Sequence, residues 1–372
     1  MRGTIIYAGG FELPDKNAAA HRVIANAKIL KKIGYNVVFV SPKNEITDNK
    51  NLVFSEILGF EAWEYPKAKG KLGIIRKNFE YKYLLETVKK YNDITAIILY
   101  NYPSFGLFNV RRYSKKKDIK LIGDITEWYQ PLNPFVKLDS FLRMRYLNKK
   151  MDGLICISTY LTKHYKKNIS NIITVPPLID KNDQKWNELS RHIKKSNDNK
   201  IHLIYAGSPG RKDKIKLIIE SIEGFNNLEL SVIGLNKKDI KSTIPNNVTF
   251  HGRLSHSESL VKLKYSDFSI FIREVNKVSK AGFPTKFVES ISMGIPVITN
   301  NTSDLLDYFE DDIGYLIPNY SKKELIKIFE TIDSNGIEIS KKMKSILIEK
   351  KDSFDICKYE EKFIDFVKGL CI

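Results

Sequence analysis

The sequence predicts an α/β protein made of two Rossmann-like, doubly wound domains. Three observations lead to this prediction: the chain has 372 residues, short apolar strands alternate with amphipathic helices along it, and one proline-containing break divides the alternation. A chain of this length exceeds the size at which a single core stays efficient, so two domains are expected. The composition, 42% hydrophobic and 28% charged, is that of an ordinary globular protein.

The first predicted domain opens with a strand, a helix and a second strand. Thr4–Ala8 is apolar, Asn17–Ile33 repeats apolar residues at the helical period before Gly34, and Asn36–Val40 is apolar again. The alternation continues with a helix near Gly73–Tyr91, strands at Ile94–Tyr100 and Ile119–Asp124, a helix at Asp139–Lys150, a strand at Gly153–Ile157, a helix at Thr159–Lys166 and a strand at Ile172–Val175. Such an order builds a parallel sheet whose ligands bind beyond the carboxyl ends of the strands.

The run from Val175 to Asp180, which contains two prolines, breaks the alternation and predicts the link between the domains. A hydrophilic stretch follows before a second alternation begins. Its predicted strands are Ile201–Ala206, Leu228–Ile233, Val248–His251, Phe268–Ile272, Val297–Thr299 and Gly314–Ile317. The second half of the chain is therefore expected to be another doubly wound domain.

Positive charge is concentrated in the first half of the chain. The formal net charge is +18, and residues 1–178 hold 30 Lys and Arg against 15 Asp and Glu, whereas the remainder holds 31 against 28. The basic clusters are Arg111-Arg112, Lys115-Lys116-Lys117, Arg143 with Arg145, Lys149-Lys150, and Lys163 with Lys166-Lys167. They indicate a polyanionic substrate or an anionic membrane surface, or else lysines on solvated faces. No nucleic-acid-binding motif accompanies the charge, so no nucleic acid partner is expected.

The chain start and the cysteines predict a reducing, cytoplasmic setting. Residues 1–7 run directly into a strand without the apolar core of a signal peptide. No apolar stretch approaches the roughly 18–20 residues that span a bilayer. The three cysteines, Cys156, Cys357 and Cys371, lack metal-ligand spacing and predict no structural disulfide.

The stretch from Lys280 to Ile298 has the most informative pattern. It reads as a Gly-Pro loop, a short helix carrying Glu289, a Gly stop and a buried strand. Backbone amides at a helix N-terminus attract phosphate, and a carboxylate one turn further along can accept sugar hydroxyls. The pattern therefore predicts a nucleotide-sugar pocket, with an ordinary helix and strand unit as the alternative. The residues assigned to this pocket are Gly282, Phe283, Pro284, Thr285, Lys286 and Glu289.

This block resembles the donor site of retaining GT-B glycosyltransferases of family 4, of the kind that build bacterial capsule and O-antigen polysaccharides. The family signature has two glutamates separated by seven residues, and Glu289 matches the second. Ala281 stands where the first would be, followed by Gly282-Phe283 as in the family. The resemblance implies that Glu289 holds the ribose hydroxyls. The first glutamate of the family lies near hydroxyls of the donor sugar, so the departure at Ala281 concerns the sugar contacts.

The resemblance covers essentially the whole chain and implies the GT-B fold, in which two Rossmann-like domains face each other across a cleft. It assigns residues 1–178 to an acceptor-binding domain and residues 179–354 to a nucleotide-sugar-binding domain. A last helix at Lys358–Leu370, within residues 355–372, is expected to pack back on the first domain.

A Gly-rich, basic loop follows the strand Ile201–Ala206 and opens a helix. Its glycines allow the backbone to approach a ligand, and its basic side chains suit a diphosphate. The residues of this loop assigned to the donor site are Gly207, Ser208, Gly210, Arg211 and Lys212. The resemblance implies that Lys212 reaches the leaving diphosphate as a catalytic residue, and a purely structural helix start is the alternative.

Further positions complete the predicted donor site. Arg273 follows a strand and is expected to contact phosphate or sugar. In similar proteins the backbone at a Gly-x-Leu turn reads the nucleobase, which assigns Arg253 and Leu254 to this role. Lys286 lies three residues before Glu289 on the same helix face, so it either completes the diphosphate site or pairs with Glu289.

In the first domain, polar groups lie near the predicted strand ends. Gly9 and Gly10 follow the first strand and permit close backbone approach on the acceptor side. His21 lies near the start of the next helix, and Asp124 and Glu127 follow a later strand. These three are candidate catalytic groups that orient an acceptor hydroxyl, although a histidine near a helix start is more often a surface or capping residue.

Together these features predict a retaining, metal-independent glycosyltransferase that uses a nucleotide-sugar donor, with UDP expected. No metal cofactor is expected, because Arg and Lys side chains would neutralise the leaving diphosphate. The acceptor expected by analogy is a lipid-linked or polysaccharide intermediate at the inner face of the plasma membrane. There the helix Asp139–Lys150 could bury Phe141, Leu142, Met144 and Leu147 in the interface. Two alternatives stay open: a UDP-sugar 2-epimerase and a non-catalytic nucleotide-sugar-binding partner subunit.

Overall fold

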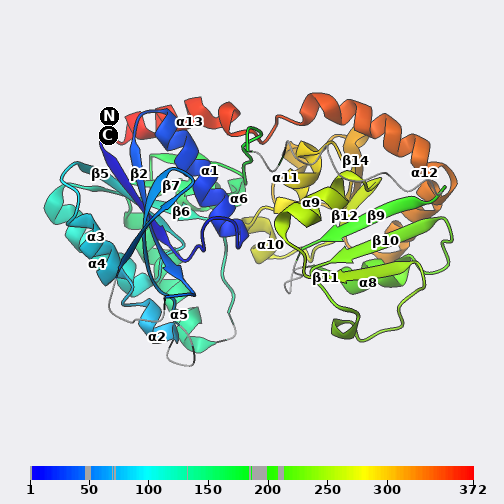
Figure 1. The fold of residues 1–372 in the computed structure, drawn as a ribbon, viewed down its shortest axis with the longest axis horizontal. Coiled ribbons are helices and arrows are strands. Elements are labelled where there is room, and N and C mark those ends of the chain that lie inside the picture. The colour runs from blue at the N-terminus through cyan, green and yellow to red at the C-terminus, as the bar shows by residue number, and fades with distance from the viewer. Residues whose placement is uncertain are drawn as a thin grey trace. The chain divides into compact units, whose positions relative to one another are not determined.

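The computed structural model describes residues 2–46, 52–68, 70, 73–131, 133–183, 186, 199–207 and 213–372. The chain divides into two compact units. Unit 1 comprises Met1–Leu178 and Ile356–Ile372, and unit 2 comprises Ile179–Asp355. The predicted fold class is confirmed, because each unit is a Rossmann-like α/β domain with its own largely parallel sheet (Figure 1).

In the described part of the chain, unit 1 forms an eight-stranded sheet with the order β3-β4-β2-β1-β5-β6-β7-β8. Its strands are β1 (Thr4–Gly9), β2 (Asn36–Lys43), β3 (Val53–Ile57), β4 (Phe60–Pro66), β5 (Ile94–Tyr100), β6 (Lys120–Ile125), β7 (Gly153–Cys156) and β8 (Ile172–Thr174). Neighbouring strands are parallel except β3 and β4, which form an antiparallel hairpin at the edge. The central strand β1 is buried over its whole length, as expected for a parallel sheet covered on both faces.

The helices of unit 1 include one that comes from the end of the chain. The helices are α1 (Ala18–Lys32), α2 (Gly73–Lys77), α3 (Tyr81–Val88), α4 (Ser104–Lys117), α5 (Pro134–Leu142), α6 (Thr159–Tyr165) and α13 (Glu360–Gly369). Asn17 caps α1 by accepting a hydrogen bond from the Ala20 N–H at 2.9 Å. Helix α13 lies beside α1, and its Phe363 and Phe366 belong to the same apolar core as Ile5 (Figure 1).

Two helix predictions in unit 1 need correction. The single helix predicted near Gly73–Tyr91 is two short helices, α2 and α3. The helix predicted at Asp139–Lys150 starts earlier, because Asn133 accepts hydrogen bonds from the first-turn amides and Pro134 occupies the first helical position. After α5 the chain continues as a π-helical turn, Arg143–Leu147. Of the four apolar residues predicted for an interface, Phe141 and Leu142 are exposed, Leu147 is half-buried and Met144 is buried.

Unit 2 contains, among the described residues, a six-stranded parallel sheet with the order β11-β10-β9-β12-β13-β14. The strands are β9 (Ile201–Ala206), β10 (Leu228–Ile233), β11 (Val248–Gly252), β12 (Phe268–Phe271), β13 (Val297–Asn300) and β14 (Gly314–Ile317). The helices are α8 (Ile215–Ser221), α9 (His256–Lys264), α10 (Lys277–Ala281), α11 (Thr285–Ser292) and α12 (Lys322–Lys350). Its two ends lie together, because the Ile179 N–H donates to the Phe354 carbonyl at 2.9 Å.

No helix within the described ranges is both long and apolar enough to cross a membrane.

Candidate functional site

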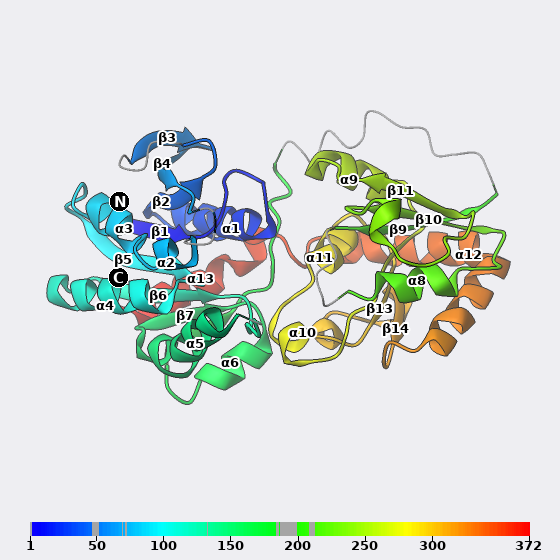
Figure 2. The same cartoon turned by 90° about the horizontal axis from the view of Figure 1, so that it is seen from below.

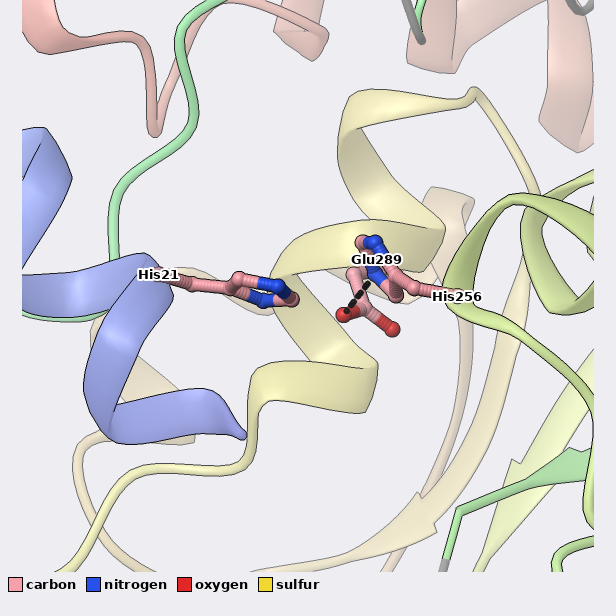
Figure 3. A group of neighbouring side chains, drawn as sticks. All are labelled: His21, His256 and Glu289. Atoms are coloured by element: carbon pink, nitrogen blue, oxygen red, sulfur yellow. Dashed lines mark hydrogen bonds and ion pairs between the residues drawn. The ribbon is translucent and has the colours of Figure 1, made fainter. Parts of the chain in front are cut away.

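Helix α11 of unit 2 carries the carboxylate of Glu289. The helix begins directly after Pro284, and no side chain caps its N-terminus within the described residues. The Oε1 atom of Glu289 lies 3.1 Å from Nε2 of His256, the first residue of α9 (Figure 3). The two side chains are 21% and 19% exposed, so the pair is held in place and still accessible. Ser255 and Glu258 form a capping box at the start of α9, which fixes the position of His256.

Lys286, one turn before Glu289, binds Asp213, which was not among the residues predicted for the site. Its ammonium donates to the carboxylate of Asp213 and, at 3.1 Å, to the hydroxyl of Tyr205. The Nε atom of Arg273 donates to Oδ1 of Asp213 at 3.2 Å, and the Tyr205 hydroxyl donates to Oδ2 at 2.6 Å. We call these four residues, Tyr205, Asp213, Arg273 and Lys286, the Asp213 cluster. Two cations and a tyrosine thus share one carboxylate.

The electrostatics of the Asp213 cluster favour an anionic ligand. The Asp213 side chain is 4% exposed. Burial acts to raise the pKa of Asp213, but Lys286 and Arg273 outweigh it and hold the pKa below its usual value. Burial lowers the pKa of Lys286, and the opposing effect of Asp213 offsets this only in part. With all three groups ionised the cluster carries one positive charge in excess, so a nearby anion would stabilise it.

The backbone around the Asp213 cluster is fixed by close contacts. Asn300 at the end of β13 accepts from the Arg273 N–H and donates to the Arg273 carbonyl, both at 2.8 Å. Gly207 ends β9 with a φ of +130°, and a Cβ atom there would lie 2.8 Å from Cε of Lys286. The backbone conformation therefore favours glycine at 207, and a side chain there would displace the end of Lys286.

The rest of the predicted phosphate loop, Ser208, Gly210, Arg211 and Lys212, lies outside the described residues. Their proposed contacts with the diphosphate remain predictions. The residues on either side, Gly207 and Asp213, both border Lys286. The loop therefore begins and ends beside the cluster of basic side chains.

The Gly282–Thr285 segment is anchored by its aromatic residue. The ring of Phe283 is buried against Phe287, Tyr308 and Phe354, so it packs in the core instead of being presented to a ligand. The Ser303 hydroxyl donates to the Gly282 carbonyl and fixes the turn. These contacts hold the start of α11, where Thr285 is half-buried and Pro284 is buried.

The positions predicted for the nucleobase turn and for the first signature glutamate differ in their exposure to solvent. Leu254 packs partly buried against the core cluster that contains Ile204 and Ile295, whereas Arg253 is exposed. Ala281, where the resembled signature has its first glutamate, is the last residue of α10 and is fully buried. Position 281 therefore presents no side chain at the surface.

Asp124 of unit 1 lies in a buried ion pair. Arg22 on α1 approaches its Oδ1 with Nη2 at 2.8 Å and with Nε at 2.9 Å, and the Tyr7 hydroxyl donates to Oδ2. Arg22 also donates to the Val175 carbonyl at 2.7 Å. Asp124 has no exposed surface. This placement favours a structural role over the predicted catalytic one. The carboxylate on β6 is bonded to Tyr7 on β1 and to Arg22 on α1, and Arg22 in turn binds the backbone at Val175.

The other candidates of unit 1 are more accessible. His21 and Glu127 are half-buried, and their catalytic roles remain predictions. Gly10 is exposed and has open space where a side chain would project. At Gly9 a Cβ atom would lie 2.7 Å from Cβ of Tyr100, so contact between β1 and β5 already accounts for this glycine.

Sequence reasoning missed three residues of the candidate site: Tyr205, Asp213 and His256. Asp213 ends the basic Gly207–Asp213 run, and an acid directly after an Arg-Lys pair was the available signal. Tyr205 is the one aromatic residue in β9, and His256 follows the Gly252–Leu254 turn closely. Their partners are distant in sequence, so no local pattern shows the contacts.

Known proteins resemble this chain in one domain and in fold. Residues 187–349 match the family model described as "Glycosyl transferases group 1". No curated protein sequence matches the chain. Among solved structures, sucrose-phosphate synthase from Thermosynechococcus elongatus has a TM-score of 0.71 at 12% identity, with 99% of each chain covered.

Two further solved structures are similar over the same length. The Anabaena protein HepE in complex with UDP-glucose has a TM-score of 0.69 at 12% identity, covering 98% of this chain and 99% of that one. The catalytic domain of starch synthase IV from Arabidopsis thaliana, bound to ADP and acarbose, has a TM-score of 0.71 at 10% identity, covering 100% and 99%. These likenesses show the GT-B fold. The family match places a glycosyl transferases group 1 domain in unit 2, and the chain is a glycosyltransferase.

Proposed function

We propose that this glycosyltransferase moves a sugar, with retention of configuration, from a nucleotide diphosphate to a lipid-linked or polysaccharide acceptor in cell-surface glycan synthesis. UDP is the proposed nucleotide. The observation that carries the proposal is the Asp213 cluster lying one helical turn from Glu289 on α11. The family match over residues 187–349 supports the same reading.

In this proposal the donor occupies the start of α11. Glu289 accepts hydrogen bonds from the ribose hydroxyls, and His256, 3.1 Å away, holds the carboxylate in place. Lys286 and Arg273 bind the diphosphate, whose oxygens take over part of the role of Asp213. Because a diphosphate carries more negative charge than one carboxylate, it compensates the excess positive charge of the cluster.

The transfer step breaks the bond between the sugar C1 and the diphosphate oxygen, and its electron pair leaves with the diphosphate. The acceptor oxygen forms the new bond to C1 on the same face, and its proton passes to the departing phosphate. The basic side chains, with Lys212 and Arg211 assigned by resemblance, stabilise the charge that develops on the leaving group. No metal is part of the proposal. Unit 1 is the proposed acceptor domain, with His21 and Glu127 as candidates to orient the hydroxyl.

The proposed location is the cytoplasm, peripheral to the inner face of the plasma membrane. The net charge of +15 in residues 1–178 supports an anionic surface as partner. No nucleic acid partner is proposed.

A thermal-shift screen of UDP, GDP and ADP and of their sugars, followed by product analysis with the stabilising donor, tests the function. Release of the nucleoside diphosphate, with the sugar passing to water or acceptor, is the expected result. A change of sugar configuration with the nucleotide still attached would establish the 2-epimerase alternative instead. Stabilisation by a donor without any turnover, with acceptor extracts supplied, would establish the non-catalytic partner subunit.

A further inference from the structure

Helix α5 turns its apolar side chains toward solvent. Phe135 is 76% exposed, Leu138 is 57% exposed and Phe141 is 49% exposed. Their spacing of three residues places them on one face of the helix, which Leu142 extends. The hydrophobic effect alone would place such a face against the core, so some other interaction accounts for its exposure.

The inward face of α5 is polar, and specific contacts fix it. Asp139 accepts a hydrogen bond from the Ser104 N–H at 2.7 Å. The buried guanidinium of Arg143 donates to the Asn101 carbonyl at 2.7 Å and lies 4.8 Å from the ring centre of Tyr129. Rotating the helix to bury its phenylalanines would break these contacts. The outward orientation of the apolar face is therefore built into the fold of unit 1.

The exposed surface continues beyond α5. In the π-helical turn that follows, Tyr146 is exposed and its ring centre lies 5.8 Å from that of Phe141. Helix α4 packs beside α5 (Figure 2), and its first turns expose Phe105 and Phe108. Within the described residues these side chains gather on neighbouring elements of unit 1. We call Phe135, Leu138, Phe141, Leu142 and Tyr146 the α5 face.

Exposed basic side chains lie on the same elements as the α5 face and on α4 beside it. Lys137 on α5 and Arg145 in the π-helical turn are exposed. The exposed side of α4 changes from Phe105 and Phe108 to Arg112 and Lys115 one turn further along. From residue 104 to residue 150 the sequence has eleven Lys and Arg against four Asp and Glu. Asp124, one of those four acids, and Arg143, one of the eleven basic residues, are buried.

An exposed apolar face with exposed basic residues beside it fits the headgroup region of an anionic bilayer. Aromatic and leucine side chains enter the boundary between headgroups and acyl chains, while lysine and arginine bind anionic headgroups. A second copy of the chain fits less well, because it would bring the same positive charge to the contact.

We propose that the α5 face is a membrane-docking surface of unit 1 that inserts into anionic lipid. The proposal deepens the proposed function, because an enzyme that docks on lipid meets a lipid-linked acceptor at the surface where that acceptor resides. Vesicle binding requires neither donor nor acceptor. A failure of docking is therefore distinguishable from a failure of sugar transfer.

Vesicle co-sedimentation tests the proposal with the full chain. Wild type should bind vesicles of phosphatidylglycerol and phosphatidylcholine, and a Phe135→Ser/Phe141→Ser variant should bind at least tenfold more weakly. The matched control is Leu306→Ser/Ile348→Ser in unit 2, whose side chains are 59% and 62% exposed, and it should bind as wild type does. Phosphatidylcholine alone or high salt should reduce binding of wild type. Unchanged thermal midpoints in all variants verify folding.

A tryptophan probe adds a direct readout of insertion. Phe135→Trp should gain fluorescence that brominated lipids quench, whereas Ile348→Trp should gain fluorescence that they do not quench. Equal vesicle binding by wild type and the Phe135→Ser/Phe141→Ser variant, or an unquenched Phe135→Trp, would overturn the proposal. So would self-association of wild type that this variant loses, in the absence of vesicle binding, because the face would then belong to a contact between copies.

Discussion

The Nε atom of Arg273 lies 3.2 Å from Oδ1 of Asp213, so the predicted phosphate-binding arginine is already engaged by an internal anion. Lys286 binds the other oxygen of the same carboxylate. A ligand diphosphate must therefore compete with Asp213 or join it. Asp213 holds two cations whose side chains are 13% and 12% exposed, at the expense of some affinity for the ligand.

Replacing Asp213 with asparagine should lower the stability of the free protein and increase the stabilisation that bound UDP provides. Removing one partner of a buried ion pair costs about 3–5 kcal/mol of unfolding free energy. UDP should restore part of this loss, so the rise in Tm on adding UDP should be larger for Asp213→Asn than for wild type. Uridine, which has no phosphate, should raise both equally. A UDP-induced rise of the same size in both proteins would separate the cluster from the diphosphate site.

Glu289→Ala should weaken nucleotide binding in a folded protein. Hydrogen bonds to a charged acceptor contribute about 1.5–3 kcal/mol, which corresponds to a loss in affinity of roughly 10- to 150-fold. Titration calorimetry with UDP measures this directly, and a 2′-deoxy nucleotide should show a smaller difference between the two proteins. Wild-type affinity for UDP in the variant would remove Glu289 from the site.

Lys212→Ala should depress turnover more than binding. A group that stabilises charge in the transition state typically contributes roughly 10²–10³ in kcat. The control is Lys214→Ala, which should retain most activity. In the wild-type protein the Lys214 ammonium lies 2.6 Å from the Glu274 carboxylate. EDTA should leave the wild-type rate unchanged. A rate abolished by chelator, together with tolerance of Lys212→Ala, would contradict the metal-independent mechanism.

Asp124→Asn should act on stability and not on chemistry. The buried carboxylate balances Arg22, so its loss should lower the unfolding free energy by about 3–5 kcal/mol while kcat at a permissive temperature stays near the wild-type value. Urea unfolding and steady-state kinetics on the same preparation separate the two effects. A large fall in kcat at wild-type stability would restore the catalytic assignment.

Unit 1 should become less stable as the pH rises toward neutrality, because of Glu80. Burial raises the pKa of Glu80 from 4.5 to about 7, against the opposing effects of the Tyr65 hydroxyl and Lys77. Between those values the folded protein holds a proton that the unfolded chain has lost, so the unfolding free energy falls as pH rises, by about 1–3 kcal/mol. Thermal midpoints from pH 5 to pH 8 measure this slope. Glu80→Gln should abolish it, and an identical slope in that variant would assign it to another group.

The central strands were predictable because apolar residues recur along each of them at the spacing of a strand. Ile94–Tyr100, Ile201–Ala206 and Leu228–Ile233 were predicted at the observed bounds. The β3–β4 hairpin was not predicted. Its turn uses Leu58 and Gly59, both at positive φ. Such turns usually contain Asn-Gly or Asp-Gly, and Leu-Gly in their place gave no recognisable turn pattern.

The candidate site was predictable where its residues form a local block. Glu289 and Lys286 lie on one short helix, so their spacing alone placed them together. Asp213 and His256 reach that helix only through tertiary structure, across 73 and 33 residues of sequence. The sequence spacing suggested Glu289 as an ion-pair partner of Lys286. The partner in the structure, Asp213, could not be predicted from spacing.

The placement of α13 sets an order for folding during synthesis. The core of unit 1 contains Phe363 and Phe366, which are synthesised after the whole of unit 2, whereas unit 2 is one continuous segment. At about 5–20 residues per second, residues 1–178 wait roughly 10–40 s for α13. Unit 2 can complete its sheet during that interval. Residues 1–178 thus emerge before unit 2 but complete their core after it, with the surface that α13 will cover left open to chaperones in the meantime.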